Sequence, residues 1–128
     1  MTERVLQHGD VVTVAFPEQI PQGREQEGYR PAIIVGVPER IGIPRFRLVV
    51  VVPMTTDKGM PWATNAPALY PRFPGGTVGL PSASIALLDQ VRSVDVIRII
   101  RYRGTLTPGQ YAVVEDGLLQ LLTLVKKG

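Results

Sequence analysis

The sequence lacks cysteine altogether and holds a single histidine, His8, and each of these features excludes a class of chemistry. Without cysteine there is no disulfide, no thiolate zinc site and no cysteine nucleophile. With one histidine, ribonuclease chemistry that depends on a histidine pair is excluded too. No motif of a metalloprotease, a serine hydrolase or a P-loop NTPase is present. Composition alone therefore indicates no enzyme, and we expect neither a bound metal nor a cofactor.

Long apolar runs are missing as well. The longest strongly apolar run, residues 48–54, is far shorter than the roughly 20 residues that a membrane-spanning helix needs. The first ten residues carry charges where a signal peptide would have its apolar segment. We therefore expect a cytoplasmic protein that makes no contact with a membrane. The length of 128 residues predicts a single domain, 1–128.

Proline is plentiful, and its placement favours strands over helices. Eleven of the twelve prolines lie between Pro17 and Pro81, and proline inside a helix breaks it. The first two-thirds of the chain should therefore hold strands and loops.

The net charge is +3, and arginine, which supplies most of the cations, is concentrated in residues 40–47 and 92–103. Such clusters are typical either of a solvated surface or of a face that binds nucleic acid.

Runs of β-branched and apolar residues predict five or six short strands. The clearest segments are 11–16, 32–37, 46–52, 83–91 and 97–102, with a weaker one near 66–70 and one helical turn at 93–96. In the first strand Val12, Val14 and Phe16 share one face. The valines of 49–52 predict burial on both faces of their strand, beneath a helix and a second subunit, before a polar turn at 53–59.

The hydrophobic period changes near the end of the chain. Thr107, Pro108 and Gln110 predict a helix start with a capping box. Apolar residues then recur at the spacing of a helix that buries one stripe: Val114, Leu118, Leu121 and Val125. Lys126 and Lys127 suit the negative end of its dipole. The order of elements predicts a mainly β (α+β) fold, a small, strongly bent antiparallel barrel with a C-terminal α-helix.

Four segments, taken in order, resemble one known family. Residues 9–12 begin with Gly-Asp, and residues 25–32 match the pattern EQxGxRPA. Residues 52–59 are similar to VPxTTxxKG, with one residue fewer between the threonines and Lys-Gly, and the Gly-Leu-Pro of 79–81 precedes an Asp-Gln pair within 88–95. Each segment alone is a weak signal, but together, in this order and spacing, they resemble the MazF/PemK toxin endoribonucleases of type II toxin–antitoxin systems.

The resemblance implies an SH3-like barrel, a homodimer and a sequence-specific, metal-independent endoribonuclease of single-stranded RNA, an mRNA interferase. It implies that an RNA 2′-hydroxyl attacks the adjacent phosphate, leaving a 2′,3′-cyclic phosphate and a 5′-hydroxyl. It also implies a cognate antitoxin peptide that neutralises the toxin. Residues 92–103 and the loop 17–29 are the expected contacts of both RNA and antitoxin, and the loop 60–79 is where cleavage specificity is expected.

Catalytic roles follow from the same resemblance. Arg30 would clamp the phosphate and Thr55 would donate a hydrogen bond to it. Glu25 is the candidate proton acceptor. The further candidates for catalysis or RNA binding are Asp89, Thr56, Gln26, Lys58 and Arg92. In the plasmid-borne branch the Asp at the position of Asp89 works with an Arg two residues earlier, where this chain has Leu87, so that mechanism does not carry over intact.

Structural roles compete with each catalytic one. Arg30 can pair with Glu25 or Glu27 and order the loop, and Thr55 and Thr56 can be ordinary turn formers. Asp89 can cap the turn at Ser93 or pair with Arg92. The aromatic side chains of the long loop either stack RNA bases or anchor the loop to the core: Trp62, Tyr70 and Phe73.

Two other functions remain open. Toxins of the same barrel that poison DNA gyrase are not catalytic and bind their target through aromatic and apolar residues at the extreme C-terminus. This chain ends in Leu-Val-Lys-Lys-Gly over residues 124–128, which lacks that feature. A degenerate relative that only binds RNA or an antitoxin is the other alternative.

Overall fold

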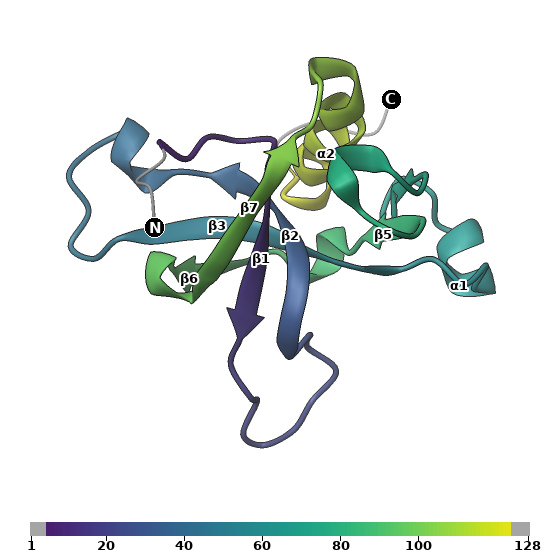
Figure 1. Ribbon diagram of the computed structural model, residues 1–128, viewed down its shortest axis with the longest axis horizontal. Helices are drawn as coiled ribbons and strands as arrows, with labels where there is room; N and C mark the ends of the chain where they lie inside the picture. Colours follow the sequence, from purple (N-terminus) through teal and green to yellow (C-terminus); the bar gives the residue numbers. More distant parts are fainter. Residues whose placement is uncertain (1–4, 124–128) are drawn as a thin grey trace.

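A computed structural model describes residues 5–123, which form one seven-stranded sheet and two α-helices (Figure 1). The strands are β1 (Asp10–Phe16), β2 (Gly28–Gly36), β3 (Leu48–Thr56), β4 (Arg72–Phe73), β5 (Ser84–Ala86), β6 (Arg92–Asp95) and β7 (Ile99–Thr105). The helices are α1 (Pro61–Thr64) and α2 (Pro108–Leu121). Four 3-10 turns complete the elements: η1 (Pro38–Arg40), η2 (Thr77–Gly79), η3 (Leu88–Gln90) and η4 (Val96–Arg98).

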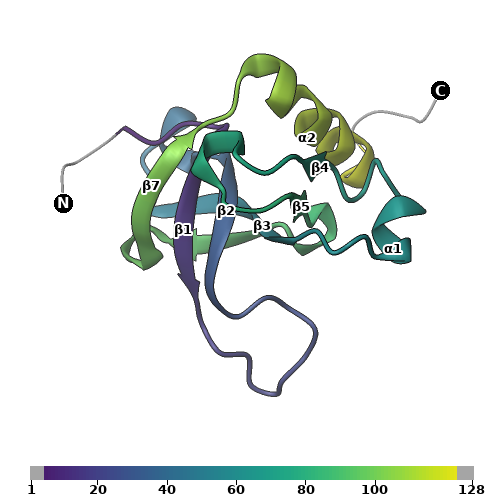
Figure 2. The same cartoon turned by 45° about the vertical axis from the view of Figure 1, so that its right-hand side comes forward.

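All strand pairs are antiparallel, and β3 organises the sheet. The order is β4-β5-β3-β2-β1-β7, and β6 also pairs with β3. One edge of β3 pairs with β2, while its other edge pairs first with β6 and then with β5. The result is the strongly bent antiparallel fold that the sequence predicts. Figures 1 and 2 show α2 over one end of the sheet, whereas the β1–β2 loop projects from the opposite end.

The core divides into two clusters because successive residues of a strand point to opposite faces. One cluster joins Val11, Ile33 and Val52 to the buried side chains of α2. The other is built by the strands themselves: Val12, Val14, Phe16, Ala32, Ile34, Val49, Val51 and Val94. The predicted shared face of Val12, Val14 and Phe16 is therefore confirmed.

The valine run of β3 is buried on both faces, as predicted, but its cover differs from the prediction. Val52 belongs to the cluster under α2, while Val49 and Val51 belong to the second cluster. That second face is covered by β1, β2 and β6 of the same chain, so the second subunit that we expected there is not needed. The bend of the sheet is what folds one half of it over the other.

Several predicted boundaries are wrong, and tertiary pairing explains each. β2 begins at Gly28 because residues 28–30 pair with the end of β1. β3 runs on to Thr56, through the turn predicted at 53–59, because Met54–Thr56 pair with β5. Near residues 66–70 the amides of Leu69 and Tyr70 donate to the Ala66 carbonyl oxygen, so a turn forms and the short strand follows as β4.

The region after β5 also departs from the prediction. The segment 83–91 is a strand only over Ser84–Ala86. The chain then turns into η3, in which the Gln90 amide donates to the Leu87 carbonyl oxygen (3.0 Å). The helical turn expected at 93–96 is strand β6, because β3 offers a free edge there. The turn comes next, as η4, where the Asp95 carboxylate accepts from the Ile97 amide (3.0 Å), and β7 begins only at Ile99.

The C-terminal helix is confirmed with its capping box. The Gln110 amide donates to Thr107 Oγ1 (3.1 Å), and the Thr107 amide donates to Gln110 Oε1 (2.9 Å). Val114 and Leu118 are buried, whereas Leu121 is 39% exposed. The predicted residues Val125, Lys126 and Lys127 lie outside the described part of the chain. Within residues 5–123 no helix has the length and apolarity to cross a membrane.

Gly117 is the point of closest approach between α2 and η3. A Cβ at this position would overlap the Leu88 side chain and come within 2.8 Å of the Ala68 carbonyl oxygen. Alanine would gain about 1 kcal/mol of helix propensity but lose about 1–3 kcal/mol to overpacking. We expect Gly117→Ala to lower the free energy of unfolding in urea, whereas Gly109→Ala in the same helix, whose Cβ would come no closer than 4.0 Å to Thr107 Oγ1, leaves it unchanged or raised. Equal stability of the two variants would contradict this contact.

Tyr111 should make stability depend on alkaline pH. Its burial, helped by the charge of Glu115, raises the pKa of the Tyr111 phenol from 10.0 to about 12. In the unfolded chain the phenol ionises from about pH 10, while the folded protein holds its proton to about pH 12. Stability is therefore lost as the pH rises through this window. We expect the fall in unfolding free energy to be smaller in Tyr111→Phe than in the wild type, and equal slopes would refute the assignment.

Candidate functional site

A cleft of about 240 Å³ opens where β2 begins and β3 ends. Because the two strands run antiparallel, the start of one lies beside the end of the other. Arg30 and Thr55, predicted from separate motifs, therefore line the same cleft. The remaining lining residues come from the same two strands, from β5 and the segment before it, and from β7: Tyr29, Pro31, Met54, Thr56, Leu80, Pro81, Ser82, Ser84 and Arg103.

The two threonines are strand residues rather than turn formers. Thr55 is half-buried and pairs with Ile85, and Thr56 is exposed and pairs with Ser84. The turn begins after them, where Asp57 Oδ1 accepts from the Gly59 amide (2.9 Å). Lys58 is exposed in this turn and does not line the cleft. The strand holds the Thr55 side chain at the cleft wall.

Arg30 stands between two hollows. Its Nε donates to the Glu27 carbonyl oxygen (3.1 Å), so within residues 5–123 it pairs with neither glutamate carboxylate that competed for it in the sequence. A second hollow, of about 400 Å³, lies on the loop side and is lined by Arg30 together with Glu25, Gln26 and Glu27. The candidate base Glu25 thus shares a hollow with Arg30, but it does not line the cleft that holds Thr55.

The β1–β2 loop, residues 17–27, is held by a residue distant in the sequence. The Gln26 amide donates to Gln90 Oε1 (2.8 Å), and Gln90 Nε2 donates to the Arg24 carbonyl oxygen (3.3 Å). Within the loop, Glu27 Oε2 accepts from the Gln19 amide (2.6 Å). Gln90 therefore fixes the segment that carries Glu25 and Gln26. The Asp-Gln motif marked this residue in the sequence, but nothing there showed what it contacts.

Asp89 and Arg92 lie outside the cleft lining, and each has a partner that the sequence did not predict. The Tyr70 hydroxyl donates to Asp89 Oδ2 (2.6 Å), so Asp89 neither caps the Ser93 turn nor pairs with Arg92. This hydrogen bond, with desolvation and the Asp89 charge, raises the pKa of Tyr70 to about 12. Arg92 lies over the Phe16 ring, 5.5 Å from its centre.

Arg103 is the cleft residue that sequence reasoning missed. It is half-buried, and its Nε donates to Thr13 Oγ1 (2.9 Å). The lining residues of the cleft include two guanidinium groups and no carboxylate. Such a hollow suits an anion with several oxygens, such as a phosphate, because guanidinium groups bind these bidentately.

Other features of the described residues serve the fold. Asp10 of the first motif is fully buried and accepts from the Gln7 amide and the Thr105 hydroxyl.

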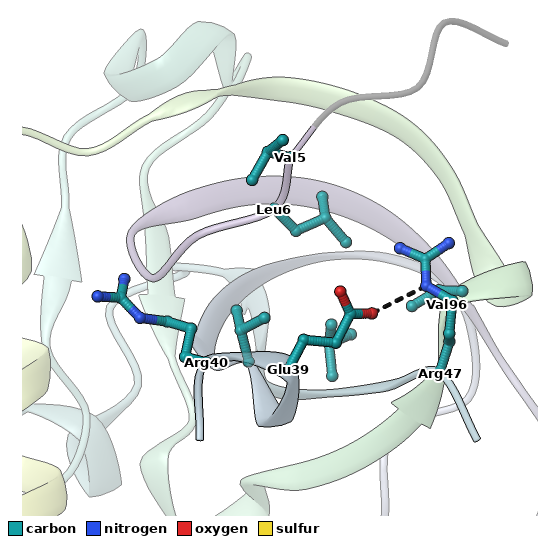
Figure 3. A pocket seen from close by; sticks show the side chains of 8 residues that line it. Val5, Leu6, Glu39, Arg40, Arg47 and Val96 are labelled. Carbon is teal, nitrogen blue, oxygen red and sulfur yellow. Dashed lines mark hydrogen bonds and ion pairs between the residues drawn. The ribbon is translucent and has the colours of Figure 1, made fainter. Parts of the chain in front are cut away.

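A larger hollow of about 470 Å³ lies near the start of β3 (Figure 3). Apolar side chains line it together with Arg40 and a Glu39–Arg47 ion pair of 2.9 Å. It contains none of the predicted site residues. No three His, Cys, Asp or Glu side chains gather as metal ligands among residues 5–123.

Comparison with solved structures finds the same fold in MazF toxins. MazF of Deinococcus radiodurans (Form-I) is 26% identical, with 94% of this chain and 99% of that chain covered at a TM-score of 0.71. The MazE–MazF structure (Form-II) of the same organism is also 26% identical, with 96% and 100% covered and a TM-score of 0.67. A mycobacterial endoribonuclease solved with its cognate antitoxin is 17% identical, covers 96% and 100%, and has a TM-score of 0.65, which shows the fold alone.

The family model agrees with the structural comparison and with the four sequence motifs. The model that describes the PemK-like, MazF-like toxins of type II toxin–antitoxin systems matches residues 7–122, and the chain therefore belongs to this toxin family.

Proposed function

We propose that this toxin is a sequence-specific, metal-independent endoribonuclease that cleaves single-stranded RNA. The observation that supports this most is the cleft, in which Arg30, Thr55 and Arg103 meet without a carboxylate among the described lining residues. Paired guanidinium groups and hydroxyl donors suit a phosphate that gains charge during the reaction. Membership of the toxin family supports the same assignment.

In the proposed reaction the RNA 2′-hydroxyl attacks the adjacent phosphorus, and the 5′ oxygen leaves and takes a proton from water. The products carry a 2′,3′-cyclic phosphate and a 5′-hydroxyl. Arg30 and Arg103 stabilise the charge of the phosphorane, and Thr55 donates to a phosphate oxygen. Arginine stays protonated and is a poor base. Glu25, in the hollow that Arg30 also lines, is therefore the proposed acceptor of the 2′ proton.

The remaining candidates take secondary roles in this proposal. Thr56 lines the cleft beside Thr55 and contacts the same phosphate or its neighbour. Lys58, exposed just beyond β3, contacts the RNA backbone. Gln26 lines the loop-side hollow and contacts RNA there, and Asp89 acts by holding Tyr70. Arg92, over Phe16, shapes the surface beside the loop.

We further propose that the toxin acts in the cytoplasm as a homodimer of single-domain chains. A cognate antitoxin peptide is the proposed regulator, since a MazF toxin of this fold has been solved together with MazE. The 92–103 stretch and the β1–β2 loop remain the proposed contacts for RNA and antitoxin.

Cleavage of a long mixed-sequence RNA in the presence of EDTA tests the function. We expect discrete cuts with 5′-hydroxyl ends, a rate lowered about 100-fold or more in Arg30→Ala, and about tenfold in Thr55→Val. Arg40→Ala is the matched control, because Arg40 is exposed in η1, does not line the cleft and lies outside the proposed RNA contacts. An Arg30→Ala protein that cuts at the wild-type rate would refute the mechanism, and a wild type that cuts no RNA would refute the activity.

Gln90 should control the order of the β1–β2 loop and, through it, the cleavage rate. Gln90→Leu removes both hydrogen bonds to the loop, and Gln90→Glu keeps the acceptor for the Gln26 amide but loses the donor to Arg24. We expect trypsin to cut after the exposed Arg24 roughly tenfold faster in Gln90→Leu, with a smaller change in Gln90→Glu. RNA cleavage should slow in the same order.

The control for the loop experiment is Gln120→Leu, a change on the exposed face of α2. It should alter neither trypsin sensitivity nor RNA cleavage. Wild-type trypsin sensitivity in Gln90→Leu would show that these two hydrogen bonds do not hold the loop.

A further inference from the structure

Trp62 is the only tryptophan in the chain, and the core does not account for its position. Its side chain is 45% exposed on the short helix α1. The small cluster beneath this region comprises Ala63, Ile85 and Leu87, with Met60 and Tyr70 packed against them, and it does not include Trp62. A large ring left half in water loses much of the stabilisation that burial would give. The exposed surface of Trp62 is therefore available to a ligand.

The aromatic residues of the 60–80 segment separate into different roles. Phe73 is 4% exposed and belongs to the main core, so it anchors the chain. Tyr70 meets the Trp62 ring edge to face, with ring centres 4.8 Å apart and an interplanar angle of 80°. Tyr70 is itself held by its hydrogen bond to Asp89 (2.6 Å). Trp62 thus has a fixed aromatic partner on one side.

The platform formed by Trp62 and Tyr70 is tied to the cleft by a short chain of contacts. Thr56 lines the cleft, and the next residue, Asp57, pairs with Arg72 through Oδ2 and Nε (2.9 Å). Arg72 Nη2 in turn donates to the Met60 carbonyl oxygen (3.5 Å), two residues before Trp62. Figures 1 and 2 both show α1 just beyond the end of β3. A strand of nucleic acid that leaves the cleft at Thr56 therefore meets α1 next.

The charges along this route favour a polyanion. Lys58 is exposed between Thr56 and Met60, and Arg72 stands at the start of β4. Single-stranded nucleic acids bind where cations follow the backbone and aromatic faces stack the bases. Within residues 56–72 the described charged side chains are Asp57, Lys58 and Arg72, and because Asp57 is paired with Arg72, Lys58 carries the net positive charge of the segment.

We propose that Trp62, backed by Tyr70, stacks an unpaired base of the RNA strand whose phosphate occupies the cleft. This subsite rests on the proposed endoribonuclease function. Its ligand class is an unpaired base of single-stranded RNA outside the cleft. Because the rings are held before the ligand arrives, stacking costs little ordering of the protein.

The single tryptophan makes the test direct. The probe is a mixed-sequence pool of short single-stranded 2′-O-methyl RNA, whose blocked 2′ oxygen prevents cleavage. We expect the pool to quench Trp62 fluorescence in the wild type. Anisotropy of the labelled pool should show binding on the order of tenfold weaker in Trp62→Leu, with Trp62→Phe close to wild type because it keeps an aromatic face. The same order should appear in kcat/KM on cleavable RNA.

The control is Phe46→Leu, which removes another exposed aromatic ring, 59% exposed, ahead of the start of β3. This change should leave binding as it is. Binding of the pool without quenching, and with equal affinity for Trp62→Leu, would overturn the subsite. Quenching only by an acidic peptide, with no response to RNA, would also overturn it and assign the platform to a protein partner.

The outcomes separate the subsite from the activity. If the wild type cuts RNA and Trp62→Leu has the same kcat/KM, the endoribonuclease function stands and the subsite is refuted. A wild type that cuts no RNA but binds the pool through Trp62 removes the endoribonuclease proposal and keeps a stacking site for single-stranded RNA.

Discussion

The antiparallel pairing of β2 with β3 is the constraint on which the site depends. It places the first residues of β2 beside the last residues of β3, and so brings Arg30 and Thr55 to one cleft although 25 positions separate them in the chain. The pairing is held by side chains on both faces of β3, with Val52 in one cluster and Val51 in the other. A slip by one residue would exchange these faces, so the core fixes the register of the site.

The 3-10 turn η3 connects the core to two other segments, the Tyr70–Trp62 pair and the β1–β2 loop. Leu88 is buried and meets α2 at Gly117, which leaves no room for a larger residue. The next residue, Asp89, accepts from Tyr70 and holds the aromatic pair with Trp62. Gln90 holds the β1–β2 loop. The buried Leu88 thus fixes the positions of its two polar neighbours, which reach different parts of the surface. A continuous strand over 83–91, as predicted, would not have directed both side chains to these partners.

The sequence predicts local features well and distant pairings poorly. The capping box at Thr107 and the burial of Val114 and Leu118 follow from spacing within a few residues, and both are confirmed, whereas Leu121 of the same predicted stripe is exposed. Strand β6 and the extension of β3 to Thr56 form because of pairing along one edge of β3. The residue pattern of each segment does not show this pairing, so the sequence predicted turns there. Arg30 and Thr55 were found through motifs.

Arg103 could not be found in that way, because it belongs to no motif and β7 holds a second arginine, the exposed Arg101. The register of β7 against β1 shifts twice, between Val11 and Val12 and between Thr13 and Val14. Simple alternation therefore does not tell which arginine of β7 faces the cleft, and neither did the charge of the 92–103 stretch. Arg103 stands at the first of these shifts, between Tyr102 and Gly104, which pair with Val12 and Val11.

The placement of charge around Arg30 resolves a conflict within the site. A general base must be near the reacting group, but a carboxylate inside the cleft would compete with an anionic ligand for the guanidinium groups. Here Glu25 and Glu27 line the hollow on the loop side of Arg30, while the described lining of the cleft is free of carboxylates. The Glu27 carbonyl oxygen, rather than its carboxylate, accepts from Arg30 Nε. The arginine is therefore oriented without being neutralised, and its charge stays available to the cleft.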